Sequence, residues 1–165
     1  MPETGTYYFK VGDYGENEYS TGVPYTLTVT VENNIDGAAE PGDDARTGAR
    51  ALTNGADQAG YIGSIGDCDW YKFEAMAGQL LQVALSRPAG NIDPCLRVEN
   101  TAGTTLWNVG EGSEGSYNAN VAWTKTISGQ TIAAAGTCYV RVWDYGDNEY
   151  STSVPYTLTV TLTGP

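Results

Sequence analysis

The sequence predicts an all-β protein with a jelly-roll-like antiparallel β-sandwich. Short segments in which apolar and polar residues alternate recur along the chain, and Gly, Asn, Asp and Pro fill the gaps between them. No segment has helical periodicity beyond one turn near residues 43–51. Regularly spaced short strands of this kind are typical of sandwiches and jelly rolls.

The strands expected in the middle of the chain are short and separated by turns. They are residues 60–65, 69–74, 79–86, 95–99, 104–108, 119–124 and 129–133. Hydrophobic residues make up 41% of the 165 residues, which is enough apolar material for one ordinary core. The chain is therefore expected to hold one complete domain and a fragment of a second.

A duplicated segment closes the chain and also opens it. Residues 5–31 (GTYYFKVGDYGENEYSTGVPYTLTVTV) align without a gap to residues 136–162 (GTCYVRVWDYGDNEYSTSVPYTLTVTL), with seven differences over 27 positions and an offset of 131 residues. In the second copy, an alternating strand at 139–143 enters an acidic turn, and a second strand follows with Leu158 and Val160 on one face. Both copies are thus predicted to be β-hairpins.

The spare hairpin determines the expected domain organisation. Residues 1–33 are read as the terminal hairpin of a preceding or neighbouring copy, residues 34–39 as a linker, and residues 40–163 as one complete module. A two-stranded hairpin is marginally stable in water, so the first copy needs a body to pack against. We therefore expect head-to-tail contacts with neighbouring copies, either in a covalent tandem array or between separate chains.

Charge and histidine content exclude several classes of function. The net charge is −12, with 8 Lys and Arg against 20 Asp and Glu, and such a surface repels nucleic acid and anionic lipid. No stretch is apolar enough for membrane insertion, and residues 1–15 lack the pattern of a signal peptide. An exported protein would then be present as its mature form or as a segment.

Catalysis is not expected. Histidine is absent, which removes the commonest general base and zinc ligand. The small-residue stretches around Ser64, Ser113 and Ser116 do not form a nucleophile elbow. Asp and Glu are abundant enough for a carboxylate-pair mechanism, but no motif points to one. Cys68, Cys95 and Cys138 lack metal-binding spacing, and they leave open either one disulfide or three small buried side chains.

Four motifs in fixed order resemble a known family. They are EPGDDARTGARAL (40–52), GDCDWYKF (66–73), DPCLRV (93–98), and GTCYVRV with a terminal YTLTV (136–160). Together they resemble the bacterial pre-peptidase C-terminal domain, which is similar in fold to the collagen-binding domains of secreted collagenases. The resemblance covers residues 40–162, and residues 5–31 resemble the last two strands of the family.

This resemblance implies a non-catalytic, jelly-roll-like module of secreted prokaryotic proteins, placed beside a peptidase or in tandem on surface proteins. It also implies Ca²⁺ as a cofactor, shared between the acidic linker and the GDxD strand. The matching residues are Glu40, Asp43, Asp44, Asp67 and Asp69.

Physical chemistry supports the same five residues. Calcium prefers carboxylate oxygens, and Asp67 and Asp69 point to one face of a strand. The alternative is that Asp43 or Asp44 caps a short helix or turn and that Asp67 forms a turn. Gly42 stands where relatives often carry Asn, so one side-chain ligand is missing.

A second group of candidate residues lies in the turn of each duplicated segment. A second metal loop is conceivable at Asp144, Asp147, Asn148 and Glu149. The corresponding residues of the first copy are Asp13, Glu16, Asn17 and Glu18. The alternative is that both segments are ordinary acidic turns. Flat rings suited to a glycan or an interface are Trp143, Tyr145, Tyr150, Tyr14 and Tyr19, and the alternative is cross-strand packing.

Two functions follow from these observations. The first is a calcium-binding repeat of an extracellular or cell-surface structural protein, assembling with copies of itself into a fibre, sheath or adhesin stalk. The alternative is a secreted binding module that recognises polysaccharide or fibrous protein as an adjunct to a peptidase.

Overall fold

The computed structural model describes residues 8–12, 21–22, 24–28, 42–88, 90, 92–110 and 122–165. The chain divides into two compact units, Met1–Val31 and Glu32–Pro165. The described residues of the first unit contain no strand.

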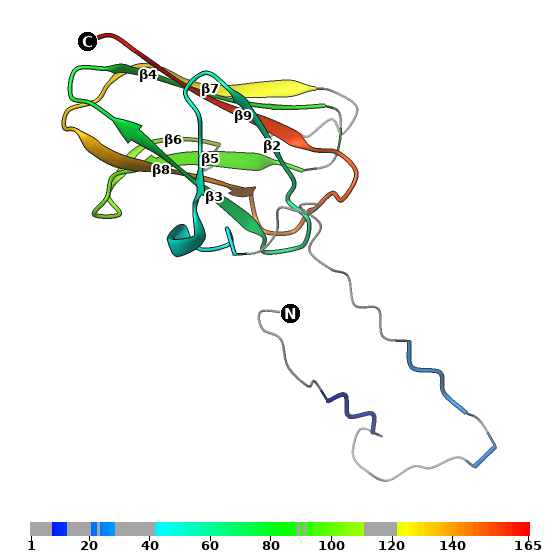
Figure 1. Cartoon of the computed structure of the whole chain (residues 1–165). Coiled ribbons are helices and arrows are strands. Elements are labelled where there is room, and N and C mark those ends of the chain that lie inside the picture. The colour runs from blue at the N-terminus through cyan, green and yellow to red at the C-terminus, as the bar shows by residue number, and fades with distance from the viewer. Residues whose placement is uncertain are drawn as a thin grey trace. The chain divides into compact units, whose positions relative to one another are not determined.

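The described part of the second unit contains a short 3₁₀ helix and nine strands (Figure 1). In chain order they are η2 (Arg46–Gly48), β1 (Arg50–Ala51), β2 (Asp57–Gly60), β3 (Cys68–Ala75), β4 (Leu80–Arg87), β5 (Pro94–Glu99), β6 (Thr105–Val109), β7 (Trp123–Thr131), β8 (Gly136–Asp144) and β9 (Tyr156–Thr163).

These strands form two sheets that face each other as a sandwich, which confirms the predicted fold class (Figure 1). One sheet has the order β1-β3-β8-β5-β6 and the other β2-β9-β4-β7. All pairs are antiparallel except β1 with β3. The core between the sheets is made by the inward residues of both, including Tyr71, Phe73, Leu81, Val83, Leu85, Leu96, Val98, Val140, Val142, Leu158 and Val160.

Three of the predicted strands are wrong in extent. The prediction for 60–65 fails because β2 ends at Gly60 and a turn follows, in which the Asp67 N–H donates to the Ser64 carbonyl at 3.2 Å. The segments 119–124 and 129–133 were predicted as two strands, yet β7 is continuous over Trp123–Thr131. Gly129, at φ +68°, forms a bulge opposite Gln82 instead of ending the strand.

The hairpin prediction is also wrong for the second copy of the duplicated segment. β8 lies between β3 and β5 in one sheet, whereas β9 lies between β2 and β4 in the other. The intervening residues 145–155 carry the chain from sheet to sheet, so β8 and β9 face each other across the core. Most of residues 5–31 lies outside the described residues, and the predicted domain boundaries at 33 and 40 do as well.

The three cysteines form no disulfide. Cys68 and Cys95 are both in register with Trp143, one on each side, so all three side chains lie on the outer face of the five-stranded sheet. Cys138 lies in the core. Within the described ranges, the structure has no helix long and apolar enough to cross a membrane.

Candidate functional site

The acidic segment before β1 folds into a tight loop against β3. The backbone N–H of Trp70 donates to the Asp43 carbonyl at 2.8 Å, which fixes residue 43 beside the strand. Gly42 has φ +98°, a conformation that side chains disfavour. A Cβ at Gly48 would overlap the Gly42 carbonyl, so the two ends of the loop meet only because position 48 is glycine.

This loop buries the carboxylate of Asp43. The residue is 1% exposed, and neither carboxylate oxygen accepts a hydrogen bond. The nearest cation is Arg50, whose Nη1 lies 3.6 Å from Oδ2. Burial raises the pKa of Asp43 above its ordinary value, and the nearby backbone N–H of Asp43 and the Arg50 charge offset this in part. Asp43 is therefore a buried acid whose oxygens are open to a further partner.

Asp69 lies next to the inward face of β3, in a chain of buried hydroxyl groups. The Tyr156 hydroxyl donates to Oδ2 of Asp69, and the Tyr71 hydroxyl lies 2.6 Å from that of Tyr156. Since Tyr156 has one proton to donate, Tyr71 is the donor in the second bond. Burial, reinforced by the charge of Asp69, raises the pKa of both phenols, which keeps them neutral. Gly60 leaves room for the two hydroxyls, because a Cβ there would overlap them.

Asp67 and Asp44 have other roles in the described structure. Oδ2 of Asp67 accepts the Gly63 N–H at 2.6 Å and so anchors the turn before β3. This is the turn-forming role considered as the alternative to metal binding. The side chain of Asp44 is exposed, and its carbonyl accepts a bond from the Cys68 thiol at 3.3 Å.

The predicted calcium ligands are brought together in part. The bond from the Trp70 N–H to the Asp43 carbonyl places residue 43 beside the part of β3 that carries Asp69. Among the described residues, no group of three or more Asp, Glu or Cys side chains could hold a metal ion. Glu40 lies outside those residues. The open oxygens of Asp43 fit a cation, and calcium binding stays a prediction.

The second predicted metal loop contains a fully hydrogen-bonded carboxylate. Oδ1 of Asp144 accepts the Asp93 N–H at 2.8 Å, and Oδ2 accepts the N–H groups of Asn148 at 3.1 Å and Glu149 at 3.0 Å. Burial raises the pKa of Asp144, and these bonds offset the effect in part. The geometry is that of a turn-anchoring acid. Cation binding here stays a prediction.

The other residues of the second predicted metal loop lie in an exposed turn or outside the described residues. Asp147 is exposed in the turn, at φ +50°. Asp13, Glu16, Asn17 and Glu18 lie outside the described residues. Asp93 has a structural role at the same turn, because its carbonyl accepts the Tyr145 N–H at 2.8 Å and its carboxylate pairs with Lys125 at 3.3 Å.

Three of the predicted aromatic residues belong to β8 and the segment that follows it. Trp143 lies on the outer face of the five-stranded sheet, with the guanidinium groups of Arg141 and Arg97 at 4.6 and 5.2 Å from the ring centroid. Tyr145 and Tyr150 belong to the segment between β8 and β9. Tyr14 and Tyr19 lie outside the described residues.

Sequence reasoning missed the basic partners of Trp143. Trp70, Arg141 and Arg97 stand in one row across three adjacent strands, and Arg141 also lies 5.8 Å from the Trp70 ring. The alternation within β3, β5 and β8 was visible in the sequence, but the strand order that aligns them was not.

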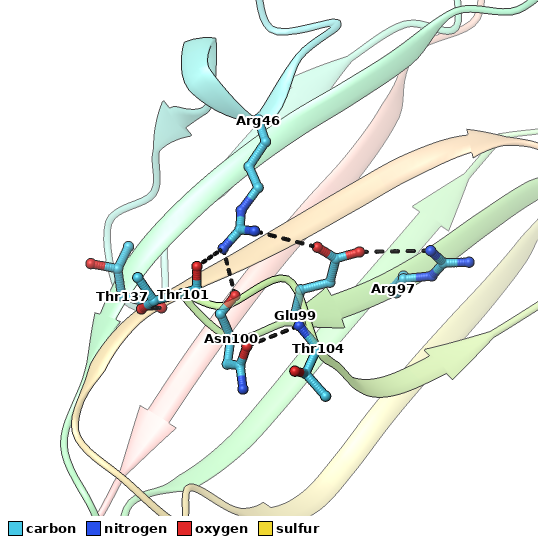
Figure 2. Close-up of polar contacts among 7 residues, drawn as sticks. All are labelled: Arg46, Arg97, Glu99, Asn100, Thr101, Thr104 and Thr137. Carbon is cyan, nitrogen blue, oxygen red and sulfur yellow. Dashed lines mark hydrogen bonds and ion pairs between the residues drawn. The ribbon is translucent and has the colours of Figure 1, made fainter.

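Arg46 was also missed, and it fastens the acidic loop to the sheet (Figure 2). Its guanidinium donates to the carbonyls of Asn100 at 2.5 Å and Thr101 at 2.7 Å, and lies 4.0 Å from Oε2 of Glu99. It also stacks over the ring of Tyr139 at 4.0 Å. The loop that carries Asp43 is thereby held to the β5–β6 turn.

Comparisons with known proteins give structural neighbours only. No protein-family profile matches the chain, and no curated protein does. The fold is similar to the pre-peptidase C-terminal domain of a collagenase from Bacillus anthracis, with a TM-score of 0.45 and 12% identity over 68% of this chain and 94% of that one. It is also similar to PliG of Aeromonas hydrophila, a periplasmic inhibitor of g-type lysozyme, with a TM-score of 0.46 and 15% identity over 70% and 96% of the two chains. The first is the domain that the sequence motifs resemble.

Proposed function

We propose that this chain is a non-catalytic, calcium-binding β-sandwich repeat of an extracellular prokaryotic structural protein, which joins neighbouring copies head to tail. The observation that carries the calcium site is the buried carboxylate of Asp43, whose oxygens accept no hydrogen bond.

Electrostatics supports a cation beside Asp43. An ionised carboxylate that leaves water without hydrogen-bond donors costs several kcal/mol unless a charge compensates it. Arg50 at 3.6 Å compensates in part. Ca²⁺ takes six to eight oxygen ligands, and Glu40, Asp44, Asp67 and Asp69 are the other residues of this chain proposed to contribute them. Bound calcium would supply charge neutralisation and cross-link the acidic loop to β3.

The test of the calcium site is thermal unfolding in EDTA and in excess calcium. A ligand that binds the native state alone at one hundred times its Kd adds about 2.7 kcal/mol, so calcium should raise the Tm of the wild type. Asp43→Asn should abolish this rise, whereas Asp57→Asn, which removes an exposed acid from β2, should retain it. An equal rise in all three proteins would contradict the site.

Asp43 is a better target than Asp69 for this experiment. Asp69 accepts the hydroxyl of Tyr156 inside the core, so its substitution destabilises the fold whether or not a metal binds. Asp43 has no such bond to lose.

The duplication supports the head-to-tail role. The second copy supplies two interior strands of the sandwich, β8 and β9, and the first copy repeats them with seven differences. One sandwich accommodates one such pair of strands, so the first copy is available to a neighbouring module, covalently linked or separate. Light scattering of the full chain with calcium and with EDTA tests this assembly. A strictly monodisperse monomer in both conditions would argue against association between separate chains.

A second function is favoured by the outer face of the five-stranded sheet. Trp70, Trp143, Arg97 and Arg141 form a row of rings and guanidinium groups there, on a chain with net charge −12. Such a face suits polysaccharide or fibrous protein. Binding to an immobilised glycan or collagen panel, lost in Trp143→Ala and kept in Tyr150→Ala, would support this function, and flat isotherms across the panel would remove it.

A further inference from the structure

We infer that residues 5–31 form the same two strands as β8 and β9, and that they complete the sandwich of a second copy of this module in place of its residues 136–162. The inference deepens the proposed repeat function and rests on it, but it does not depend on the cation. The two strands would enter both sheets of the neighbouring sandwich at once.

The position to be filled is defined by the strands around β8 and β9. β8 pairs with β3 over residues 136–143 and with β5 over residues 139–144, and β9 pairs with β2 and β4. Both strands are therefore interior, with a neighbour on each side. A sandwich without them would expose four strand edges and the core residues that these strands cover, which favours any segment that fits the gap.

The apolar residues of the first copy match the inward positions of that gap. At the offset of 131 residues, Val140, Val142, Tyr156 and Leu158 correspond to Phe9, Val11, Tyr25 and Leu27. The four residues of the second copy are 0–1% exposed.

The four residues of the first copy have the opposite environment. Phe9 is 60% exposed, Val11 50%, Tyr25 73% and Leu27 53%. Removing apolar side chains of this size from water stabilises a protein. Three of the four residues are identical in the two copies, and Phe9 replaces Val140. These apolar side chains are thus buried in one copy and exposed in the other, and a second sandwich is the environment that would bury them.

The polar residues of the gap are matched as well. Tyr156 places its hydroxyl between Tyr71 and Asp69, and Tyr25 carries the same hydroxyl. Asp144 anchors the turn after β8 through three backbone N–H groups, and Asp13 is its counterpart. Insertion of the first copy would therefore leave the buried polar network of the acceptor satisfied.

One difference gives the exchanged sandwich a chemical signature. Trp143 lies in register between Cys68 and Cys95 on the outer face, and both cysteines are buried. The first copy carries Gly12 at this position. A sandwich completed by residues 5–31 has no side chain between the two thiols, so Cys68 becomes more accessible to a thiol reagent while the fold is intact.

The test disables each copy in turn within the full chain. Leu158→Asp places a charge at a fully buried position and disfavours β9, and Leu27→Asp is its matched change in the first copy. We expect Leu27→Asp to melt cooperatively like the wild type but to lose the association that residues 5–31 provide. Leu158→Asp should form oligomers in which residues 5–31 complete neighbouring sandwiches, and these oligomers should still melt cooperatively. The double variant should lose the cooperative melt. Light scattering gives the size, and thiol labelling followed by mass spectrometry should show faster modification of Cys68 in folded Leu158→Asp than in Leu27→Asp.

Two outcomes would overturn the inference. If Leu158→Asp loses its cooperative melt as completely as the double variant, residues 5–31 do not replace residues 136–162. If Leu158→Asp folds but is strictly monomeric, the segment fills its own chain and no second copy is involved. Measuring all variants in EDTA and in calcium separates this result from the proposed calcium site, because strand replacement is expected in both conditions.

Discussion

Nη1 of Arg50 lies 3.6 Å from Oδ2 of Asp43, while no hydrogen bond reaches either oxygen of that buried carboxylate. A side chain that supplies one distant charge and no hydrogen bond leaves an ionised acid poorly compensated. The fold therefore holds a charge that it stabilises poorly by itself, and the response of the protein to pH and to calcium should reflect this.

The first prediction concerns pH in the absence of metal. Burial raises the pKa of Asp43 in the folded state above the value of 3.8 that it has in the unfolded chain. At pH values between these two pKa values, the folded protein binds a proton on Asp43 that the unfolded chain has released. This contribution to stability is present at low pH and is lost as pH rises through the folded pKa. Asp144 has a raised pKa for the same reason and contributes with the same sign.

Asp43→Asn should therefore flatten part of the pH dependence and make the metal-free protein more stable at pH 7. Urea unfolding in EDTA between pH 4 and 7 measures both effects, with pH values chosen to bracket a carboxyl titration. Asp57→Asn removes the same formal charge from the surface and is the control for net charge. An identical slope in wild type and Asp43→Asn would contradict the interpretation of Asp43.

The second prediction concerns the buried hydroxyls. Tyr156→Phe removes the donor to Asp69 and the acceptor for Tyr71, so it leaves polar groups in the core without their partner. We expect a loss of about 1–3 kcal/mol in the free energy of unfolding. Tyr150→Phe, in a tyrosine that is 36% exposed, should change stability little. Equal stability of the two variants in urea would show that the hydroxyl chain contributes nothing.

The third prediction concerns Gly60, the last residue of β2. A methyl group there would overlap the hydroxyls of Tyr156 and Tyr71, whose positions are fixed by Asp69. Gly60→Ala should destabilise by about 1–3 kcal/mol, as other overpacked cores do. Gly22→Ala is the control, because a Cβ there meets nothing within 4 Å. If Gly60→Ala costs as much stability in the Tyr156→Phe background as it does in the wild type, the Tyr156 hydroxyl is not the cause.

Sequence reasoning predicted the parts of the fold that depend on local alternation. β3, β4, β5 and β6 lie within one or two residues of their predicted ranges, because each has apolar residues on one face and turn residues at both ends. The same reasoning failed for β8 and β9. Alternation fixes which residues point inward, but it does not tell whether two successive strands pair with each other or lie in opposite sheets.

For the candidate site, sequence reasoning identified individual residues but not the contacts between them. The motifs identified Asp43 and Asp69 as special acids, and both are buried. Their partners Arg50 and Tyr156 could not be assigned, because those contacts depend on how the loop and β9 reach β3 in space. Asp67 and Asp144 were also proposed as metal ligands, but in the structure their carboxylates accept hydrogen bonds from backbone N–H groups in turns.

The last prediction concerns Arg46, which ties the loop of Asp43 to the β5–β6 turn (Figure 2). One planar guanidinium donates to the carbonyls of Asn100 and Thr101, at 2.5 and 2.7 Å, and stacks on Tyr139. Lysine keeps the charge but lacks this planar fork of donors. We therefore expect Arg46→Lys to lose most of what Arg46→Ala loses, about 1–2 kcal/mol for a half-buried site. Both variants should also show a smaller rise of Tm with calcium, because the loop that presents Asp43 is less ordered before the ion binds. If Arg46→Lys retains the wild-type Tm in EDTA and in calcium, charge alone fastens the loop and the bonds to the two carbonyls are dispensable.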